Sequence, residues 1–391
     1  MAEYEDEELL RTRDGRHASV GYVELFFDLV FVFAVTQLSH TLIEQPSLQG
    51  LMQTAVMTGA VWWIWINTAW ATNWLDVERT PVRVMLFVMM GLGLLMSVSI
   101  PGAFEARGLV FALGLAGFQL VRTAFVIWAV RNDDPLRRNF QRILGWHAGS
   151  AALWIAGGAI GGEWQLAIWA AALLVDSLGP AASFWLPGLG RSTTSDWNVE
   201  GGHIAERWAL FTIIALGESV LVIGATMADL DWTPAVFAAF AASLGGAAAM
   251  WWIYFSTNAE AAAEVISDSD DPGRMARLAY TYIHLLPVAG IIVTAVGDEW
   301  VLAHPHGDAE LKTVLAAVGG PALYLAGVAL FKLAVFRKAS PAWLAGLGLL
   351  GGLALCSGWL APVWLAVGST TILVLVGVWE AIALARGARV A

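Results

Sequence analysis

Residues 22–43 read YVELFFDLVFVFAVTQLSHTLI, an apolar stretch interrupted by the carboxylates Glu24 and Asp28 and by a few uncharged polar side chains. A membrane-spanning helix needs about 20 mostly apolar residues, because it rises 1.5 Å per residue through a hydrocarbon core about 30 Å thick. The stretch therefore predicts a transmembrane helix. It decides the fold class, since similar stretches recur along the rest of the chain.

The recurring apolar stretches predict about twelve transmembrane helices. They cover residues 22–43, 51–70, 83–100, 109–130, 141–160, 164–186, 204–227, 235–256, 276–296, 313–335, 341–359 and 361–384. Composition agrees, because 58% of the 391 residues are hydrophobic and 14% are charged, against about 25% charged in soluble domains. The 21 Trp also suit the interface between lipid and water. We therefore expect an all-α, polytopic helical membrane protein whose partner is the lipid bilayer.

The basic residues predict which way the helices point. Most of the 21 Lys and Arg fall in the tails and in loops on the side of the N-terminus, whereas Arg107 and Lys312 fall in loops of the other side. Loops rich in Lys and Arg stay in the cytoplasm. We therefore expect cytoplasmic N- and C-termini and an even number of spans. Residues 3–8 are acidic where a signal peptide would be basic, so the first span is expected to remain as an anchor.

The two halves of the sequence resemble each other. WWIW at 62–65 matches WWIY at 251–254, and AVTQL at 34–38 matches ALGES at 215–219. Six predicted spans separate the copies, so we expect two parallel six-helix repeats about an axis along the membrane normal; chance similarity between apolar helices is the alternative. The expected organisation is an acidic cytoplasmic tail over 1–21, a first repeat over 22–186, a cytoplasmic linker over 187–203, a second repeat over 204–384 and a cytoplasmic tail over 385–391.

Polar side chains inside the predicted spans are the candidate functional residues. An ionisable group in the membrane costs about 2.5–3.5 kcal/mol on insertion scales, so it needs a reason to be there. We expect an ion pathway or proton relay to use Glu24, Asp28, Gln37, Asp176, His203, Glu206, Glu218 and His284. We expect structural ion pairs from Arg122, Arg207 and Lys332. The alternative for all of them is a network that only fixes helix packing, for example through Asp28 or Glu206 with Arg122.

Several functional classes find no support in the sequence. The chain has one cysteine, Cys356, and no GxSxG, P-loop, HExxH or CxxC motif, so we expect no enzyme activity, no cofactor and no metal site. The formal charge of −11 and the lack of a basic stretch argue against nucleic acid. The expected partners besides lipid are a small inorganic cation or a proton, and the sequence is compatible with a homo-oligomer.

Three motifs resemble those of a known family. VELFFDLVFVFA at 23–34, with QLSH at 37–40, is similar to the signature of the bacterial low temperature requirement protein A family. HIAERW at 203–208, IALGES at 214–219 and YIHLLP at 282–287 resemble its other motifs. The resemblance runs from about residue 15 to the C-terminus. It implies a multi-pass protein of the bacterial inner membrane with a link to stress response.

A second resemblance concerns function. FFDLVF at 26–31, with Ala34 and Thr36, is similar to the Phe-Ser-Asp signature of a six-helix potassium-channel family, with Phe27 in place of the Ser. This resemblance and the intramembrane carboxylates favour a channel or transporter for a monovalent cation or proton, with a pathway between the two repeats. The alternative is a non-transporting scaffold or stress-linked sensor whose charges only fix helix packing. An enzyme acting on lipid is disfavoured, because no nucleophile–base pair is apparent.

The expected orientation can be tested with reporter fusions. Fusions after Arg138, Arg191 and Arg337 should report the cytoplasm, because these positions follow basic loops. Fusions after Gln45 and at Asp231 should report the opposite side. An external signal at Arg138 would overturn the orientation.

Overall fold

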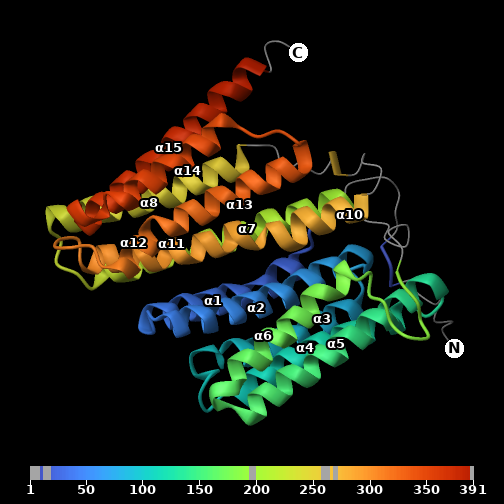
Figure 1. Cartoon of the computed structure of the whole chain (residues 1–391). Helices are drawn as coiled ribbons and strands as arrows, with labels where there is room; N and C mark the ends of the chain where they lie inside the picture. Colours follow the sequence, from blue (N-terminus) through green and yellow to red (C-terminus); the bar gives the residue numbers. More distant parts are fainter. Residues whose placement is uncertain (1–8, 12–18, 193–199, 257–264, 267–271, 388–391) are drawn as a thin grey trace. The chain divides into compact units, whose positions relative to one another are not determined.

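The computed structural model of the chain is helical throughout the part that it describes (Figure 1). It describes residues 9–11, 19–192, 200–256, 265–266 and 272–387. Each predicted span coincides with a helix or with helices that follow one another directly, which confirms the all-α fold class. The predicted tails, 1–21 and 385–391, and the predicted linker, 187–203, fall partly outside the described residues, so their boundaries stay predictions.

The described residues form two compact units. Unit 1 takes those within Met1–Thr41, Ser47–Arg207 and Asp271–Arg274. Unit 2 takes those within Leu42–Pro46, Trp208–Asp270 and Met275–Ala391. Each unit is described by itself below.

Unit 1 is a bundle of helices. The helices are α1 (Tyr22–Glu44), α2 (Leu48–Trp74), α3 (Thr80–Ser97), α4 (Gly108–Ala129), α5 (Asp134–Ile160) and α6 (Gly162–Ala181), joined by the first turns of α7 (Gly201–Ala228). α4 packs against α3 and α5, and α6 packs against α5 and α2 (Figure 1). This arrangement places α2, α4, α5 and α6 around one interior.

Aromatic side chains hold α1 against α3 and α4. Phe27 and Phe31 are fully buried, and their rings lie 6.1 and 6.3 Å from that of Phe118 on α4. Phe26 meets Phe87 of α3 edge to face at 6.3 Å. Each of these ring pairs adds about 0.5–1.5 kcal/mol beyond simple area burial, so Phe26 and Phe27 help to position Glu24 and Asp28 on either side of them.

Unit 2 contains the remaining helices. They are most of α7, then α8 (Pro234–Phe255), the last two residues of α10 (Pro272–Ala276), the π-helical turn η3 (Arg277–Ile283), α11 (Leu285–Ala303), α12 (Leu311–Ala317), α13 (Gly319–Phe336), α14 (Pro341–Leu355) and α15 (Pro362–Gly387). α8 packs along α15, α11 packs along α13, and α14 packs against α13 and α15. α10, η3 and α11 follow one another directly and cover the predicted span 276–296. Together they form one rod-like helix whose α-helical geometry is interrupted at η3.

Pro287 explains why that rod is interrupted. A proline has no backbone N–H, and its ring clashes with the carbonyl four residues earlier, here that of Ile283. Pro287 lies in the first turn of α11, where a missing N–H costs no helical hydrogen bond. The helix therefore restarts at Leu285, and the residues before it widen into the π-helical turn that ends beside His284.

α11 approaches α12 and α13 closely because small residues line the contact. A Cβ added at Gly290 would overlap the backbone of Tyr324, and one added at Gly327 would overlap Pro287. Gly320 and Gly297 face the opposite helix in the same way. Lipid tails are as apolar as the side chains, so membrane helices associate through such close packing rather than through the hydrophobic effect.

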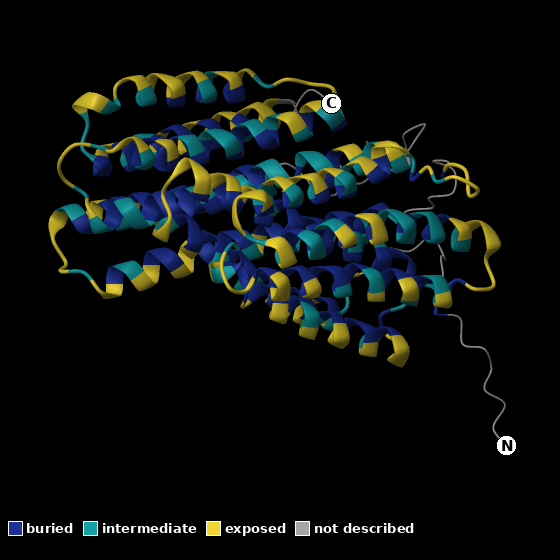
Figure 2. Cartoon of the chain, turned by 60° about the horizontal axis from the view of Figure 1, so that its bottom comes forward, coloured by how far each residue is buried: buried dark blue, intermediate teal, exposed yellow. Residues whose placement is uncertain are grey.

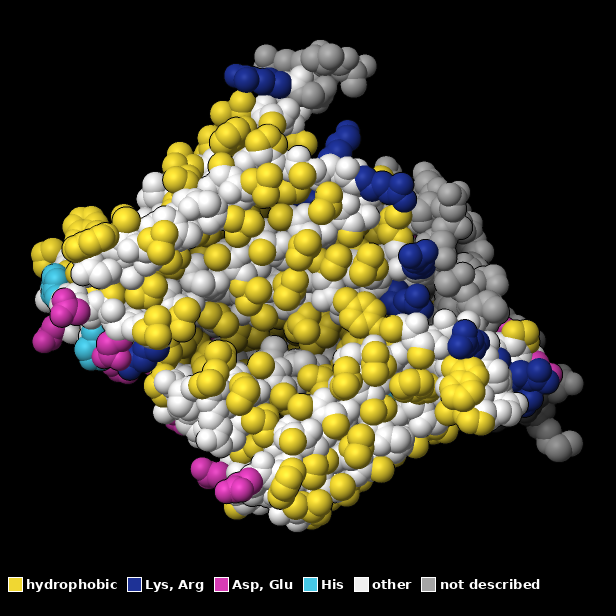
Figure 3. Space-filling view, viewed as in Figure 1, with side chains coloured by type: hydrophobic (Ala, Val, Ile, Leu, Met, Phe, Trp, Pro, Cys, Tyr) yellow, Lys and Arg dark blue, Asp and Glu magenta, His cyan; other side chains and the backbone are white. Residues whose placement is uncertain are grey.

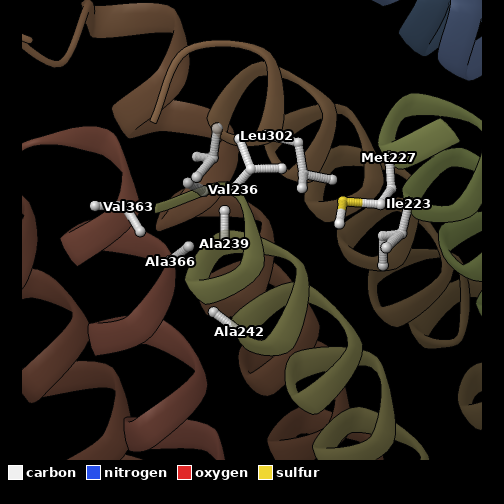
Figure 4. Packing of buried hydrophobic residues seen from close by; sticks show 10 residues of the cluster. Ile223, Met227, Val236, Ala239, Ala242, Leu302, Val363 and Ala366 are labelled. Carbon is white, nitrogen blue, oxygen red and sulfur yellow. The ribbon is translucent and has the colours of Figure 1, made fainter. Parts of the chain in front are cut away.

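Apolar packing in unit 2 concentrates at the end where α7 finishes and α8 begins. Figure 4 shows Ile223 and Met227 of α7, Val236 of α8, Leu302 of α11 and Val363 of α15 converging there. Alanines of α8 and α15 lie between them and let these two helices come close.

The outer surface is apolar enough for a bilayer. Nine helices within the described ranges are long and apolar enough to span one; they are Tyr22–Glu44, Thr80–Ser97, Gly108–Ala129, Asp134–Ile160, Gly201–Ala228, Pro234–Phe255, Gly273–Ala303, Leu311–Phe336 and Pro362–Arg386. α14 is shorter, with 15 residues, and α2 is buried along most of its length, so it needs a less apolar surface. The count of about twelve spans stays a prediction.

The side chains are distributed as in a membrane protein. Figure 2 shows buried and exposed faces along the helices, and the exposed positions include Leu344, Leu355 and Trp359. In Figure 3, hydrophobic side chains cover much of the visible face of each unit, and most visible Lys and Arg side chains lie near one end of the helices. A polytopic membrane protein is therefore the class that the fold supports.

Replacement of Gly290 by alanine tests the close contact between α11 and α13. We expect Gly290→Ala to lower the stability of the protein by about 1–3 kcal/mol, because the new Cβ overlaps backbone that cannot move aside. Thermal unfolding in detergent micelles measures this. Gly351→Ala on α14 is the matched control, since nothing lies within 4 Å of its added Cβ. Equal melting temperatures for the two variants would contradict the proposed contact.

Candidate functional site

A buried ionic cluster joins the start of α1 to the start of α7 in unit 1. We call it the α1–α7 cluster, and its members are Arg11, Glu24, Asp28, His203 and Arg207. Glu24 and Asp28 are one helical turn apart and therefore share a face of α1. Arg207 is fully buried, as are Glu24 and His203, and Asp28 is 2% exposed.

The strongest contact of the cluster is a two-pronged ion pair. Arg207 donates from Nη1 to Asp28 Oδ2 and from Nη2 to Asp28 Oδ1, each at 2.8 Å. Trp65 of α2 donates its indole N–H to Asp28 Oδ1 at 3.0 Å. The two N–H donors of the guanidinium match the two oxygens of the planar carboxylate. The pair therefore fixes the orientation of both side chains and also balances their charges. The packing alternative offered Arg122 as an example of a partner for Asp28; in the structure the partner is Arg207.

Glu24 forms the second half of the cluster. Its Oε1 lies 3.1 Å from His203 Nε2, and its Oε2 accepts from Arg11 Nη2 at 3.2 Å and from the backbone N–H of Gly21 at 3.0 Å. The Nδ1 atom of His203 lies 3.4 Å from the amide nitrogen of Asn73. The Glu24–His203 contact is short enough for a proton to pass directly between the two side chains.

Arg11 also caps the end of α2. Its Nε donates to the carbonyl oxygens of Thr72 and Leu75, each at 3.0 Å. The last carbonyls of a helix have no partner within the helix and carry a partial negative charge, so a guanidinium is favourable there. Arg11 therefore links the end of α2 to the buried carboxylate of Glu24.

A second group of buried polar side chains fills the interior between α4, α5 and α6. We call it the α4–α6 cluster, and its members are Gln119, Arg122, His147, Ser150, Trp154 and Asp176. Asp176 Oδ2 accepts from Gln119 Nε2 and Trp154 Nε1, each at 3.2 Å. Arg122 Nη1 donates to the carbonyl of Ile64 at 3.0 Å and to Thr68 Oγ1 at 3.3 Å.

α2 connects the two clusters. Trp65 bonds Asp28 of the first cluster, while Ile64 and Thr68 bond Arg122 of the second. The three α2 positions lie within about one turn of one another. Polar contacts therefore extend from Glu24 to the region of Asp176 with α2 as the shared element.

The structure brings some predicted residues together and leaves others apart. Glu24, Asp28 and His203 meet, and Arg207 joins them. Glu206 accepts instead from the backbone N–H of Val20 at 3.0 Å. Gln37 is half-buried further along α1 and is not part of either cluster. Their proposed role in an ion pathway stays a prediction.

The predicted residues of unit 2 occupy three separate places. Glu218 is fully buried on α7. His284 Nε2 lies 2.8 Å from the hydroxyl of Tyr254. Lys332 forms its expected ion pair, and the partner is Glu380 at 2.9 Å.

Sequence reasoning missed four residues that matter here. Arg11 lies in the polar tail, Trp65 lies in an aromatic run, and Asn73 lies at a helix end, so none of them stood out. Glu380 was detectable, because it is a lone charge within an apolar stretch. Within the described ranges, no group of three or more His, Cys, Asp and Glu side chains could hold a metal ion.

Apolar helices that enclose two clusters of ionisable side chains define a polytopic helical membrane protein with a charged interior. The chain belongs to the family described as Bacterial low temperature requirement A protein (LtrA), which matches residues 19–378. It is also 38% identical over 379 residues to the Uncharacterized protein RA0937 of Rhizobium meliloti (strain 1021), a match that covers 96% of this chain and 92% of that protein. No solved structure matches.

Loss of the Asp28 charge tests how far the ion pair holds unit 1 together. We expect Asp28→Asn to destabilise the protein by about 3–5 kcal/mol, because it leaves the Arg207 guanidinium buried without a counter-charge. Glu78→Gln is the matched control, since Glu78 pairs with Arg83 at the surface and is 65% exposed; its effect should stay below about 1 kcal/mol. Unfolding in detergent gives both values. A small effect of Asp28→Asn would show that the pair contributes little.

Proposed function

We propose that this protein transports a proton or a small monovalent cation across the cytoplasmic membrane of a bacterium, with both termini inside. The observation that carries the proposal is the pair of buried clusters connected through α2. Together they place carboxylates, guanidiniums and imidazoles in the interior of one bundle, where each charge is costly. Packing alone could be achieved with small or hydroxyl-bearing residues.

The chemistry of the α1–α7 cluster supports proton movement in particular. Histidine is the side chain whose charge ordinarily changes near neutral pH. His203 lies within proton-transfer distance of Glu24, and both are fully buried. Arg11 and Arg207 supply fixed positive charge on either side of Glu24, so a proton can move between Glu24 and His203 without leaving an isolated charge.

A non-transporting scaffold or sensor is the second candidate, and one observation favours it. Asp28 already receives two N–H groups from Arg207 and one from Trp65. These donors occupy both carboxylate oxygens, as they would in a contact that only joins helices. Asp28 therefore supports the scaffold, whereas the Glu24–His203 contact supports transport.

Reconstitution into liposomes separates the two candidates. A pH-sensitive dye inside the vesicles measures proton flux under an imposed pH gradient, and potassium- and sodium-sensitive dyes measure cation flux. We expect flux above that of empty vesicles, reduced at least tenfold by His203→Gln and by Glu218→Gln. The latter substitution keeps the shape of a mid-span side chain and removes its charge, so the melting temperature should change little.

Glu163→Gln is the control, because Glu163 is an exposed carboxylate at the start of α6. Its flux should equal that of the unmodified protein. Folding of every variant is checked by gel filtration and thermal unfolding in detergent. Flux no greater than that of empty vesicles for the unmodified protein would reject transport and favour the scaffold.

A further inference from the structure

In each unit, a basic residue within one predicted span is followed, two predicted spans later, by an acidic residue within a span. Arg122 lies on α4 and Asp176 on α6 in unit 1. Lys332 lies on α13 and Glu380 on α15 in unit 2. In the predicted repeats these are the fourth and sixth spans, and all four residues lie within about two turns of the C-terminal ends of their helices. The two pairs therefore take corresponding positions along the chain.

In unit 2 this pair is closed, by which we mean that the two side chains hydrogen-bond each other directly. Lys332 Nζ donates to Glu380 Oε1 at 3.2 Å and to Oε2 at 2.9 Å. The two side chains are 5% and 6% exposed. The ammonium group also lies 4.8 Å from the ring centre of Trp343 on α14. Both charges are thus satisfied by direct contact.

In unit 1 the corresponding pair is open, because the two side chains bond other groups. Asp176 bonds Gln119 and Trp154 through Oδ2 alone, and Arg122 bonds α2 through Nη1. Asp176 Oδ1 and Arg122 Nη2 are both buried, and neither has a hydrogen-bond partner in the part of the chain that the structure describes. A charged oxygen buried without a donor is strongly unfavourable, although the two side chains interact electrostatically.

We propose that Asp176 is a proton-binding carboxylate of the transport pathway and that Arg122 is its positioning partner, an inference that rests on the proposed transport function. Uptake transfers a proton from a hydronium ion to Oδ1, which forms an O–H bond and leaves a neutral carboxyl group and water. Release returns the proton to water and restores the carboxylate. The oxygen that binds the proton is the one that the protein leaves without a donor.

The surroundings of Asp176 suit a proton rather than a metal cation. A sodium or potassium ion needs several oxygen ligands to replace its hydration shell, and Asp176 offers one unbonded oxygen. The hydroxyl of Ser150 has one proton to donate and lies 3.2 Å from both Gln119 Oε1 and the backbone carbonyl of His147; it also interacts with Asp176. The positive charge of Arg122 would also repel a metal ion. A proton needs only Oδ1.

The charged groups around Asp176 are few. α4 contributes Arg122, and α5 contributes His147, which bonds Thr123 at 3.0 Å and interacts electrostatically with Arg122. α2, which also packs against α6, has no titratable side chain anywhere in its length. Protonation of Asp176 therefore changes mainly its electrostatic interaction with Arg122.

This arrangement couples the proton to α2. A neutral Asp176 exerts little attraction on Arg122, whose Nη1 then stays on Ile64 and Thr68. A charged Asp176 attracts the guanidinium, and its unbonded Nη2 is the group available to respond. Movement of Arg122 alters its hydrogen bonds to α2. The same helix bonds Asp28 through Trp65.

Matched substitutions in the two units test the proposal in liposomes. Asp176→Asn keeps the size of the side chain and cannot bind a proton, so proton flux should fall at least tenfold. Asp176→Glu keeps a titratable carboxyl and should retain measurable proton flux. Glu380→Gln opens the closed pair of unit 2; it should lower the melting temperature and leave proton flux per folded protein within about twofold of the unmodified protein.

The outcomes separate this inference from the proposed function. If the unmodified protein moves neither protons nor potassium nor sodium, transport itself is rejected. If it moves protons and Asp176→Asn moves them equally fast, transport stands and the role of Asp176 is rejected. If it moves potassium or sodium without protons, transport stands and the proton site is rejected.

Infrared spectroscopy gives a readout that does not require flux. Acidification of the purified protein should produce the carbonyl band of a protonated carboxyl group. Because the chain has 32 Asp and Glu residues, Asp176→Asn should remove one component of that band, and Glu380→Gln should keep this component. A band that persists unchanged in Asp176→Asn would overturn the proposal, and an Asp176→Asn protein that fails to fold leaves the comparison of the unmodified protein with Asp176→Glu, in which the band should shift.

Discussion

The ion pair between Asp28 and Arg207 is the contact around which unit 1 is organised. A charge inside a low-dielectric bundle is tolerable only when its counter-charge is held in the right direction. Here the pair joins the second turns of α1 and α7. Its neighbours contact the same groups: Trp65 donates to the carboxylate of Asp28, and Arg207 also donates to the backbone carbonyl of Glu24 at 3.3 Å. Phe27 and Phe31 matter for the same reason, because they pack α1 against Phe118 of α4 and thereby help to position the carboxylates.

The positions of the helices could be predicted from the apolar stretches of the sequence, because a segment buried in lipid must be apolar. The first predicted span, 22–43, differs from α1 by one residue, because an apolar stretch in a bilayer has no alternative to a helix. The fifth span was predicted from 141 and begins at Asp134, since Asp133 caps a polar first turn that carries no hydropathy signal. The sixth was predicted to reach 186 and ends at Ala181, just after Pro180, because Ser183 and Phe184 take positive φ values. Local chemistry, rather than hydropathy, therefore sets the ends.

The candidate site was less predictable, because pairing across the bundle is not a local property. Spacing alone places Glu24 and Asp28 on one face of a helix. It also places His203 and Arg207 one turn apart. Nothing local indicates that residues about 180 positions apart would meet, and Arg122 was an equally reasonable partner for Asp28. Arg11 shows the same limit from the other direction: it belongs to a polar tail, yet its guanidinium reaches a fully buried carboxylate.

The open pair of unit 1 and the closed pair of unit 2 differ because the fifth helix of each predicted repeat offers different polar groups. α5 supplies Trp154, which donates to Asp176, and Ser150, which orients Gln119. α14 reads PAWLAGLGLLGGLAL and supplies one polar atom, the indole nitrogen of Trp343, which makes no hydrogen bond within the described residues. In unit 2, Lys332 is therefore the donor that binds Glu380. In unit 1 neutral donors compete with Arg122 for the carboxylate and hold one of its oxygens. Beside the apolar fifth helix, the two charges are therefore in direct contact. Beside the polar one, one carboxylate oxygen is left without a hydrogen-bond donor among the described residues.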